Sequence, residues 1–300
     1  MTEYQATRAS SDRHILAEGP VWIADLATVI WVDIEKGSVF TGRLSGTSII
    51  EISRYSFEGQ VGAAVPGDDG SLLVATHDRL VRLAPDGHRT DGPIIVSPGT
   101  NSRANDGACD PAGRFLVGTL ALDDREGQEV LYRWETNGSL TTMDSDLTLS
   151  NGLAWSPDGT LMYSTDTVPG IIWVRDYDVA SGEFGSRRHH LHITQGFPDG
   201  ICVDSRGYLW VAIWGEGEVR SFTPSGIADD TVRVPAPHVS SVAFVGADLN
   251  LLLITTASRD LSPAELEQHP DAGCLFIAEL PTAGFPSTLW ASSALAAFVR

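Results

Sequence analysis

Four residues with oxygen-bearing side chains stand immediately before a glycine at equivalent positions of a sequence repeat. They are Glu18 in "AEGP", Asp106 in "NDGA", Asn151 in "SNGL" and Asp199 in "PDGI". Carboxylate and amide oxygens, without Cys or His, are the ligands that calcium, magnesium and manganese ions prefer, and carboxylates also bind zinc. An unpaired group of carboxylates repels itself, and a bound cation removes that cost. The residue types therefore predict a metal site, provided that the fold brings them together.

A simpler explanation exists for each position taken alone. Asn, Asp and Glu before Gly also form turns and hydrogen-bond to their own backbone, which is common in Gly-rich β proteins. This alternative stays open for any single residue. It does not account for their concentration at one position of a sequence repeat.

The repeat consists of a small or turn residue, a short apolar strand, a turn and a second apolar strand. Its six copies are separated by 41 to 48 residues and begin at Gly19, Gly62, Gly107, Gly152, Gly200 and Ser241. The position before each start is occupied by Glu18, Val61, Asp106, Asn151, Asp199 and Ser240. Each copy continues into a third strand and usually a weaker fourth, and four strands in about 45 residues is the size of a propeller blade.

We therefore expect an all-β fold, a six-bladed β-propeller with four-stranded blades around a central channel. Residues 1–300 are expected to form this single domain, with "YQATRAS" at 4–10 supplying the outer strand of the last blade. In a propeller the innermost strands line the channel, so the residues before each start converge on one axis. One helix is expected at "SPAELEQH", with Ser262 as its N-cap and Pro263 at its first position.

The charge composition argues against some classes of binding partner. The 300 residues carry 20 Lys and Arg against 39 Asp and Glu, a formal net charge of −19, which repels nucleic acid and anionic lipid. We therefore expect no nucleic-acid and no membrane partner. The polar start "MTEYQATRASSDRH" lacks the pattern of a secretion signal, and a cytoplasmic location is expected. The three cysteines are far apart and are expected to be free, buried thiols.

Four stretches resemble the senescence marker protein, gluconolactonase and luciferin-regenerating enzyme family, the regucalcin-like proteins. They are "ILAEGPVW", "RANDGACDPAGRFLVGTL", "SNGLAWSPDGTLMYSTDT" and "GFPDGICVDSRGYLWVA", and the likeness runs from about residue 14 to 280. The resemblance implies a six-bladed propeller with one divalent metal in the channel, and in many members the hydrolysis of sugar lactones.

Carried over by motif, the resemblance implies Glu18, Asn151 and Asp199 as metal ligands and Arg103 and Asn105 as substrate-binding residues. The repeat itself selects Asp106 rather than Asn105, and neighbours on a strand point to opposite sides. We follow the resemblance here, which assumes a local bulge, and keep Asp106 as the alternative.

One departure from the family pattern concerns the substrate. Some relatives have a glutamate that contacts the sugar after the third blade's "GT" strand, where this chain has Ala121 in "GTLALDDREGQE". This leaves open a substrate different from theirs. Asp123, Asp124 and Glu126 are alternative carboxylates in that loop, and a solvated acidic loop is the simpler explanation.

The resulting functional hypothesis is a metal-dependent lactonase, a carboxylic ester hydrolase that opens aldonolactones. Asp199 is expected to act as ligand and general base. Calcium is the first expectation for the metal, with zinc, magnesium and manganese as alternatives. Two other functions remain open: a metal-dependent phosphotriesterase or esterase using the same site, and a calcium-binding propeller without catalysis.

Overall fold

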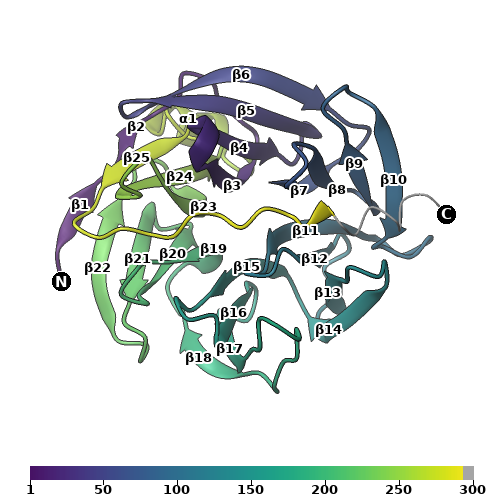
Figure 1. Cartoon of the computed structure of the whole chain (residues 1–300). Coiled ribbons are helices and arrows are strands. Elements are labelled where there is room, and N and C mark those ends of the chain that lie inside the picture. The colour runs from purple at the N-terminus through teal and green to yellow at the C-terminus, as the bar shows by residue number, and fades with distance from the viewer. Residues whose placement is uncertain (293–300) are drawn as a thin grey trace.

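Strands of the first four repeats form four separate four-stranded antiparallel sheets, arranged around a central axis (Figure 1). The computed structural model describes residues 1–292. The first sheet contains β3 (Ala17–Ile23), β4 (Thr28–Asp33), β5 (Ser38–Ser45) and β6 (Ser48–Ser56), and the second contains β7 (Val61–Pro66), β8 (Leu72–Thr76), β9 (Arg79–Leu83) and β10 (Arg89–Ile94). The third contains β11 (Ser102–Cys109), β12 (Phe115–Ala121), β13 (Glu129–Trp134) and β14 (Leu140–Leu147), and the fourth contains β15 (Ser150–Trp155), β16 (Leu161–Asp166), β17 (Ile171–Asp176) and β18 (Arg188–His192).

The rest of the ring is one continuous nine-stranded sheet. One part contains β19 (Phe197–Val203), β20 (Leu209–Trp214), β21 (Glu218–Phe222), β22 (Ala228–Arg233) and β1 (Glu3–Gln5). The other part contains β23 (His238–Val245), β24 (Leu251–Ala257), β25 (Phe276–Glu279) and β2 (Thr7–Arg8).

The expectation of six separate four-stranded blades is therefore wrong, although the all-β propeller architecture holds. Four sheets stand apart as blades, and the strands of the fifth and sixth repeats share one sheet. The physical reason is a single backbone pairing, in which Trp214 at the end of β20 lies opposite His238 at the start of β23. Their rings stack at a centroid distance of 4.2 Å, which reinforces this junction.

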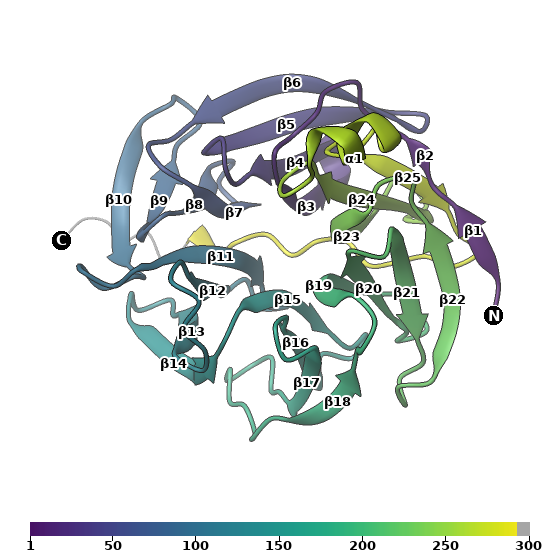
Figure 2. The same cartoon turned by 180° about the vertical axis from the view of Figure 1, so that it is seen from behind.

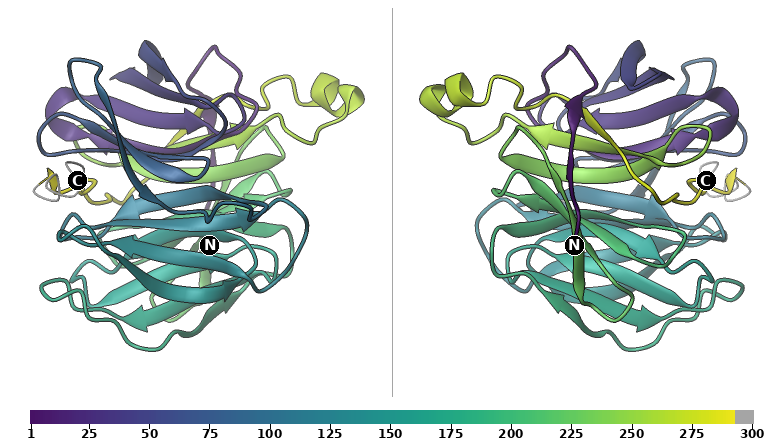
Figure 3. Two further views of the ribbon diagram at one scale, coloured as in Figure 1. Left: turned by 90° about the vertical axis from the view of Figure 1, so that its right-hand side faces the viewer. Right: turned by 90° about the vertical axis from the view of Figure 1, so that its left-hand side faces the viewer.

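The start of the chain lies on the outer edge of the nine-stranded sheet (Figure 3). Thr7 pairs with Ile277 in an antiparallel register, which confirms the expected outer strand beside β25. Glu3 instead pairs in parallel with Thr231 of β22. The first eight residues thus add strands to both parts of this sheet.

Two segments outside the sheets lie on opposite faces of the ring (Figures 2 and 3). Helix α1 (Pro263–Gln268) projects from one face and begins with the predicted cap, because the Ser262 side chain accepts the Glu265 backbone N–H. The C-terminal segment, residues 281–292, crosses the other face near the axis (Figure 1). Among residues 1–292, no helix combines the length and hydrophobicity needed to span a bilayer.

Apolar side chains fill the spaces between neighbouring sheets. Ile30 and Val32 of β4, for example, belong to the same buried cluster as Val61 and Val74 of the second sheet. A four-stranded sheet cannot cover both of its apolar faces alone, so each is stabilised by its neighbours in the ring.

All six strands nearest the axis, β3, β7, β11, β15, β19 and β23, are interrupted by a shift of pairing register. In β3 the shift follows Glu18, and in β15 it follows Asn151. A β-bulge bends its strand and redirects the side chain beside it. The repeat position singled out by sequence therefore coincides with a recurrent bulge.

Candidate active site

All five predicted site residues line one cavity of about 380 Å³. Glu18 comes from β3, Arg103 and Asn105 from β11, Asn151 from β15 and Asp199 from β19. Each has an exposed fraction of 6% or less. Four strands from four different repeats thus place buried polar side chains around a common space.

A chain of hydrogen bonds orients the amides in this cavity. Arg103 Nη1 donates to Asn105 Oδ1 at 2.7 Å, and Asn105 Nδ2 donates to Asn151 Oδ1 at 3.0 Å. Asn151 Nδ2 in turn donates to Thr167 Oγ1 at 3.0 Å, and that hydroxyl donates to the Pro198 carbonyl at 2.8 Å. The chain connects the third, fourth and fifth repeats and holds the Asn105 and Asn151 side chains in defined orientations.

Glu18 and Asp199, the two buried carboxylates of the cavity, both have raised pKa values. Burial raises the pKa of Glu18 well above its usual value, and the nearby charges of Asp199 and Asp106 raise it further. Burial, followed by the charge of Asp106, likewise raises the pKa of Asp199. Within residues 1–292, the buried Oδ1 of Asp199 has no hydrogen-bond partner. An unpartnered buried carboxylate oxygen is costly unless a cation or a donor binds it.

Arg103 supplies the positive charge beside these acids. Its side chain is buried, and Nη1 also donates to the Ala104 carbonyl at 3.0 Å. Burial lowers its pKa to about 10. The guanidinium therefore remains charged at neutral pH, and it lowers the pKa values of both Glu18 and Asp199.

Glu18, Asn151 and Asp199 suit a hard cation by their chemistry. They offer two carboxylates and one amide oxygen in one cavity, and Asp199 Oδ1 lacks a partner among the described residues. Across residues 1–292, no group of three or more His, Cys, Asp or Glu side chains is placed to hold a metal. The predicted set combines two carboxylates, Glu18 and Asp199, with the amide of Asn151.

The bulge in β11 separates Asn105 from Asp106. The pairing register shifts between Ala104 and Gly107, in line with the local bulge assumed when the family resemblance was followed. Asn105 lines the 380 Å³ cavity, whereas Asp106 lines a second cavity of about 560 Å³ that also contacts the C-terminal segment. The Asp106 Oδ1 accepts the Gly107 N–H at 2.7 Å, and burial raises its pKa to about 6.

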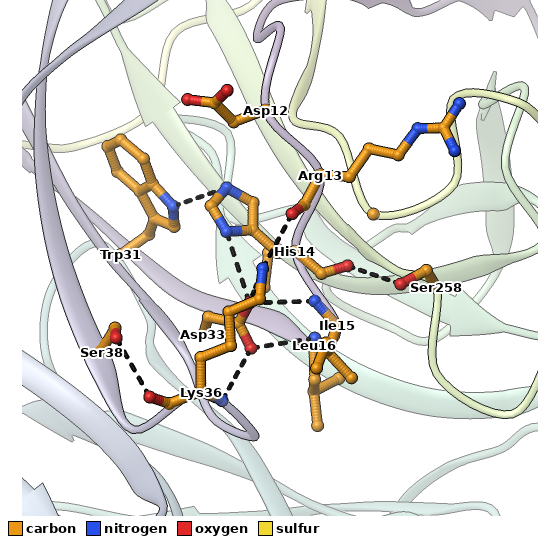
Figure 4. A network of polar contacts seen from close by, with 12 residues as sticks. Asp12, Arg13, His14, Ile15, Leu16, Trp31, Asp33, Lys36, Ser38 and Ser258 are labelled. Carbon is orange, nitrogen blue, oxygen red and sulfur yellow. Dashed lines mark hydrogen bonds and ion pairs between the residues drawn. The ribbon is translucent and has the colours of Figure 1, made fainter. Parts of the chain in front are cut away.

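Asp33, a buried aspartate at the end of β4, holds the backbone segment that leads to Glu18 (Figure 4). Asp33 Oδ2 accepts the Ile15 N–H at 2.9 Å, and Oδ1 accepts the Leu16 N–H at 3.3 Å. Lys36 Nζ lies 3.1 Å from Oδ2, and His14 Nδ1 lies 3.6 Å from it. Burial alone would raise the pKa of Asp33, but the contacts with His14, Ile15 and Lys36 hold it well below the usual range.

The fourth repeat uses the same arrangement before Asn151. Asp166, at the end of β16, accepts the backbone N–H groups of Thr148 and Leu149 at 3.1 and 3.0 Å. Here burial raises the pKa of Asp166. In both repeats the aspartate at the end of the second strand anchors the backbone shortly before a proposed ligand.

Glycine is required where the strands nearest the axis approach each other. A Cβ on Gly152 would lie 2.5 Å from the Asp199 carbonyl oxygen, and one on Gly62 would lie 2.5 Å from the Asn105 carbonyl oxygen. Both distances are too short for a real side chain. Gly152, which follows Asn151, and Gly62 therefore permit close contact between neighbouring strands.

The three carboxylates of the acidic loop after β12 lie in different surroundings. Asp123 pairs with Arg125 at 2.7 Å, and Glu126 is exposed. Asp124 lines the 380 Å³ cavity together with Ala121. Of the three alternative carboxylates, Asp124 is thus the one that the fold places at the site.

Several cavity residues were missed by the sequence comparison. Thr167 follows β16 and orients Asn151, while Trp214 and Arg259 line the same cavity. The comparison considered only the position before each repeat start. Aligning the ends of the second strands as well would have drawn attention to Thr167 and Trp214.

The sequence model of the SMP-30/Gluconolactonase/LRE-like region matches residues 16–258. The chain belongs to this family. Among its SMP-30/gluconolactonase relatives, regucalcin of Danio rerio is 32% identical over 281 residues, covering 92% of this chain and 94% of that protein. Pentonolactonase XacC of Haloferax volcanii is 32% identical over 285 residues, covering 90% and 93%.

A solved structure has the same fold. It is described as a calcium-binding protein, regucalcin, from Agrobacterium tumefaciens. The two chains superpose with a TM-score of 0.90 at 25% sequence identity, covering 97% of this chain and 99% of the other.

Proposed function

We propose that this chain hydrolyses sugar lactones, opening aldonolactone rings to the corresponding acids. The observation that carries the proposal is the cavity in which the unpartnered Asp199 Oδ1 lies with Glu18, Asn151, Arg103 and Asn105. Relatives named as lactonases, including the Haloferax pentonolactonase, support the same reaction class.

One divalent cation would be held by Glu18, Asn151 and Asp199, with calcium as the first candidate and zinc, magnesium and manganese as alternatives. When bound, such an ion polarises a carbonyl and lowers the pKa of a water molecule. The raised pKa values of Glu18 and Asp199 support this assignment, because a cation stabilises both carboxylates in their charged form.

Asp199 would act as the general base. Its carboxylate accepts a proton from water while the water oxygen forms a bond to the lactone carbonyl carbon. The ring C–O bond then breaks, and the leaving ring oxygen takes the proton to become a hydroxyl. The product is the open-chain hydroxy acid, so atoms and charges balance without a further reactant.

Arg103 and Asn105 would hold the ring hydroxyls. The Nε of Arg103 has no hydrogen-bond partner among the described residues, and the 2.7 Å contact between the two side chains keeps both in fixed positions. Fixing the ring relative to Asp199 lowers the entropic part of the barrier.

The test is hydrolysis of a panel of aldonolactones by the purified protein, before and after chelation and with each of the four metals added back. We expect activity that is lost on chelation and restored by at least one metal. Unchanged hydrolysis after complete metal removal would contradict the metal requirement. Failure to hydrolyse any lactone in the metal-loaded state would contradict the proposed reaction.

A calcium-binding protein without catalysis is the second candidate, favoured by the description of the Agrobacterium structure as calcium-binding. The same panel separates the two functions. Calcium binding that Asp199→Asn weakens, combined with inertness of the wild type toward every lactone, would favour this second candidate.

A further inference from the structure

Three exposed apolar side chains line the mouth of the candidate site. Leu122, Val168 and Phe197 have exposed fractions of 42%, 45% and 49%, and all three line the 380 Å³ cavity. Single exposed apolar residues are common on protein surfaces, but a group of them at one cavity is typical of a ligand-binding surface. We call these three residues the apolar arc.

The apolar arc is continuous with the polar floor of the site. Val168 directly follows Thr167, whose hydroxyl accepts a hydrogen bond from Asn151. Phe197 is the first residue of β19, two positions before Asp199. The three members of the arc come from the third, fourth and fifth repeats, which are neighbours in the ring.

Phe197 is held by a strand pairing and by stacked aromatic side chains beside it. It pairs across the sheet with Trp214, which also lines the cavity. Trp214 stacks on His238 at 4.2 Å with an interplanar angle of 10°, and His238 Nδ1 lies 2.9 Å from the Arg259 carbonyl oxygen. Aromatic side chains held in this way supply apolar contact area at a small entropic cost.

The same cavity is also lined by charged side chains. Arg259 lines the cavity and contacts two carboxylates, Glu35 at 2.8 Å and Asp260 at 3.3 Å. Asp124 adds a further negative charge. The Arg259 cation at this cavity is thus already paired with carboxylates, whereas the apolar arc offers contact to an uncharged, apolar substituent.

We propose that the preferred substrate is a lactone whose ring carries an apolar substituent, which packs against Leu122, Val168 and Phe197 while the ring carbonyl lies at the buried oxygens. This inference rests on the proposed lactonase function and names its substrate class. Each methylene buried on the arc is expected to raise kcat/KM by about fourfold.

The test compares kcat/KM for δ-lactones with no alkyl substituent and with alkyl substituents of one, three and five carbons, alongside gluconolactone. The expected result is a rise in kcat/KM with the length of the alkyl substituent. Values of kcat/KM that do not change with chain length would overturn this inference and leave the lactonase function standing. No hydrolysis of any lactone would overturn both.

Serine variants then connect the preference to the arc. The preference is measured as kcat/KM for the longest alkyl lactone divided by kcat/KM for the unsubstituted lactone. Phe197→Ser is expected to lower this ratio by about tenfold. Val168→Ser is expected to lower it by less. Ile227→Ser removes an equally apolar residue that is 66% exposed and outside the cavity, and should keep the ratio. Loss of folded protein lowers both rates alike, so an unchanged ratio in Phe197→Ser would overturn the proposal.

Discussion

Asp199 combines burial, a raised pKa and an oxygen without a partner among the described residues. Such a combination is unfavourable for stability and is characteristic of functional sites. Its proximity to Glu18 adds repulsion, since the charge of Asp199 also raises the pKa of Glu18. The residue is therefore retained at a cost that a bound cation would offset.

We expect Asp199→Asn to lower lactone hydrolysis by about 10²- to 10⁴-fold, because the variant loses the base and one charged ligand. The same variant should be more stable than the wild type in excess chelator, since a buried charge is removed. Lactone hydrolysis and thermal unfolding in chelator measure the two effects. Activity close to that of the wild type would contradict the assigned role.

Because the pKa of Asp106 is raised, we expect the stability of the chelated protein to depend on pH. Its pKa is raised from 3.8 to about 6, so between these values the folded state binds more protons than the unfolded state. Stability should therefore fall as pH rises from about 4 to 6, by on the order of 3 kcal/mol. Denaturant unfolding across this range measures the slope, and Asp106→Asn should reduce it. Equal slopes in the variant and the wild type would exclude Asp106 as the cause.

At the residue level, sequence comparison within the repeat predicted the cavity positions of Glu18, Asn151 and Asp199. It selected Asp106 in the third repeat, where only the family resemblance pointed to Asn105. The reason is the bulge between Ala104 and Gly107, which changes the facing of both residues. A bulge depends on pairing with the neighbouring strand, so a single strand's sequence does not reveal it.

At the scale of the strands, the anchors before Glu18 and Asn151 differ in how they use their oxygens. Asp33 accepts backbone N–H groups with both carboxylate oxygens, whereas Asp166 accepts both of its N–H groups with Oδ1. An asparagine retains one oxygen acceptor and replaces the other with a donor.

We therefore expect Asp33→Asn to destabilise the protein by more than Asp166→Asn. Replacing either residue with alanine should cost about 2–4 kcal/mol, because buried N–H groups lose their acceptor. Denaturant unfolding of the four variants gives the comparison. An Asp166→Asn variant as unstable as Asp166→Ala would contradict the single-oxygen arrangement.

The strand-level prediction that proved wrong was the separation of the last two blades. The four strands of each repeat are visible in the sequence as apolar runs, but the junction depends on one pairing, Trp214 with His238. Neither residue carries a local signal for pairing with a strand of another repeat. Whether two adjacent sheets join therefore depends on how the repeats meet in the closed ring, and not on the sequence of any one repeat.

At the scale of the whole molecule, the C-terminal segment ties the second and third sheets together. Trp290 is buried, stacks on Trp134 at a centroid distance of 5.5 Å, and donates its N–H to the Pro66 carbonyl at 2.8 Å. The next residue, Ala291, donates to the Gly113 carbonyl at 2.9 Å. These contacts fasten the segment across the face opposite α1 (Figure 3).

Trp290→Ala is expected to destabilise the protein by about 3–5 kcal/mol, the usual cost of removing a large buried aromatic side chain. Leu289→Ala removes the adjacent, 39% exposed side chain and should change stability by less than about 0.5 kcal/mol. Equilibrium unfolding in denaturant measures both. Similar effects of the two substitutions would show that the segment contributes little to stability.

The C-terminal segment also has a kinetic consequence. Residues 285–288 of this segment line the second cavity, so we expect the segment to hinder passage there and leave the first cavity, which the five proposed site residues line, as the entrance. Substrate and product would then share one entrance, and a departing hydroxy acid must vacate it before the next lactone can enter. Steady-state measurements with added product should accordingly show inhibition that raises KM and leaves kcat unchanged. A reduced kcat at saturating lactone would instead indicate that the acid has a separate place to bind.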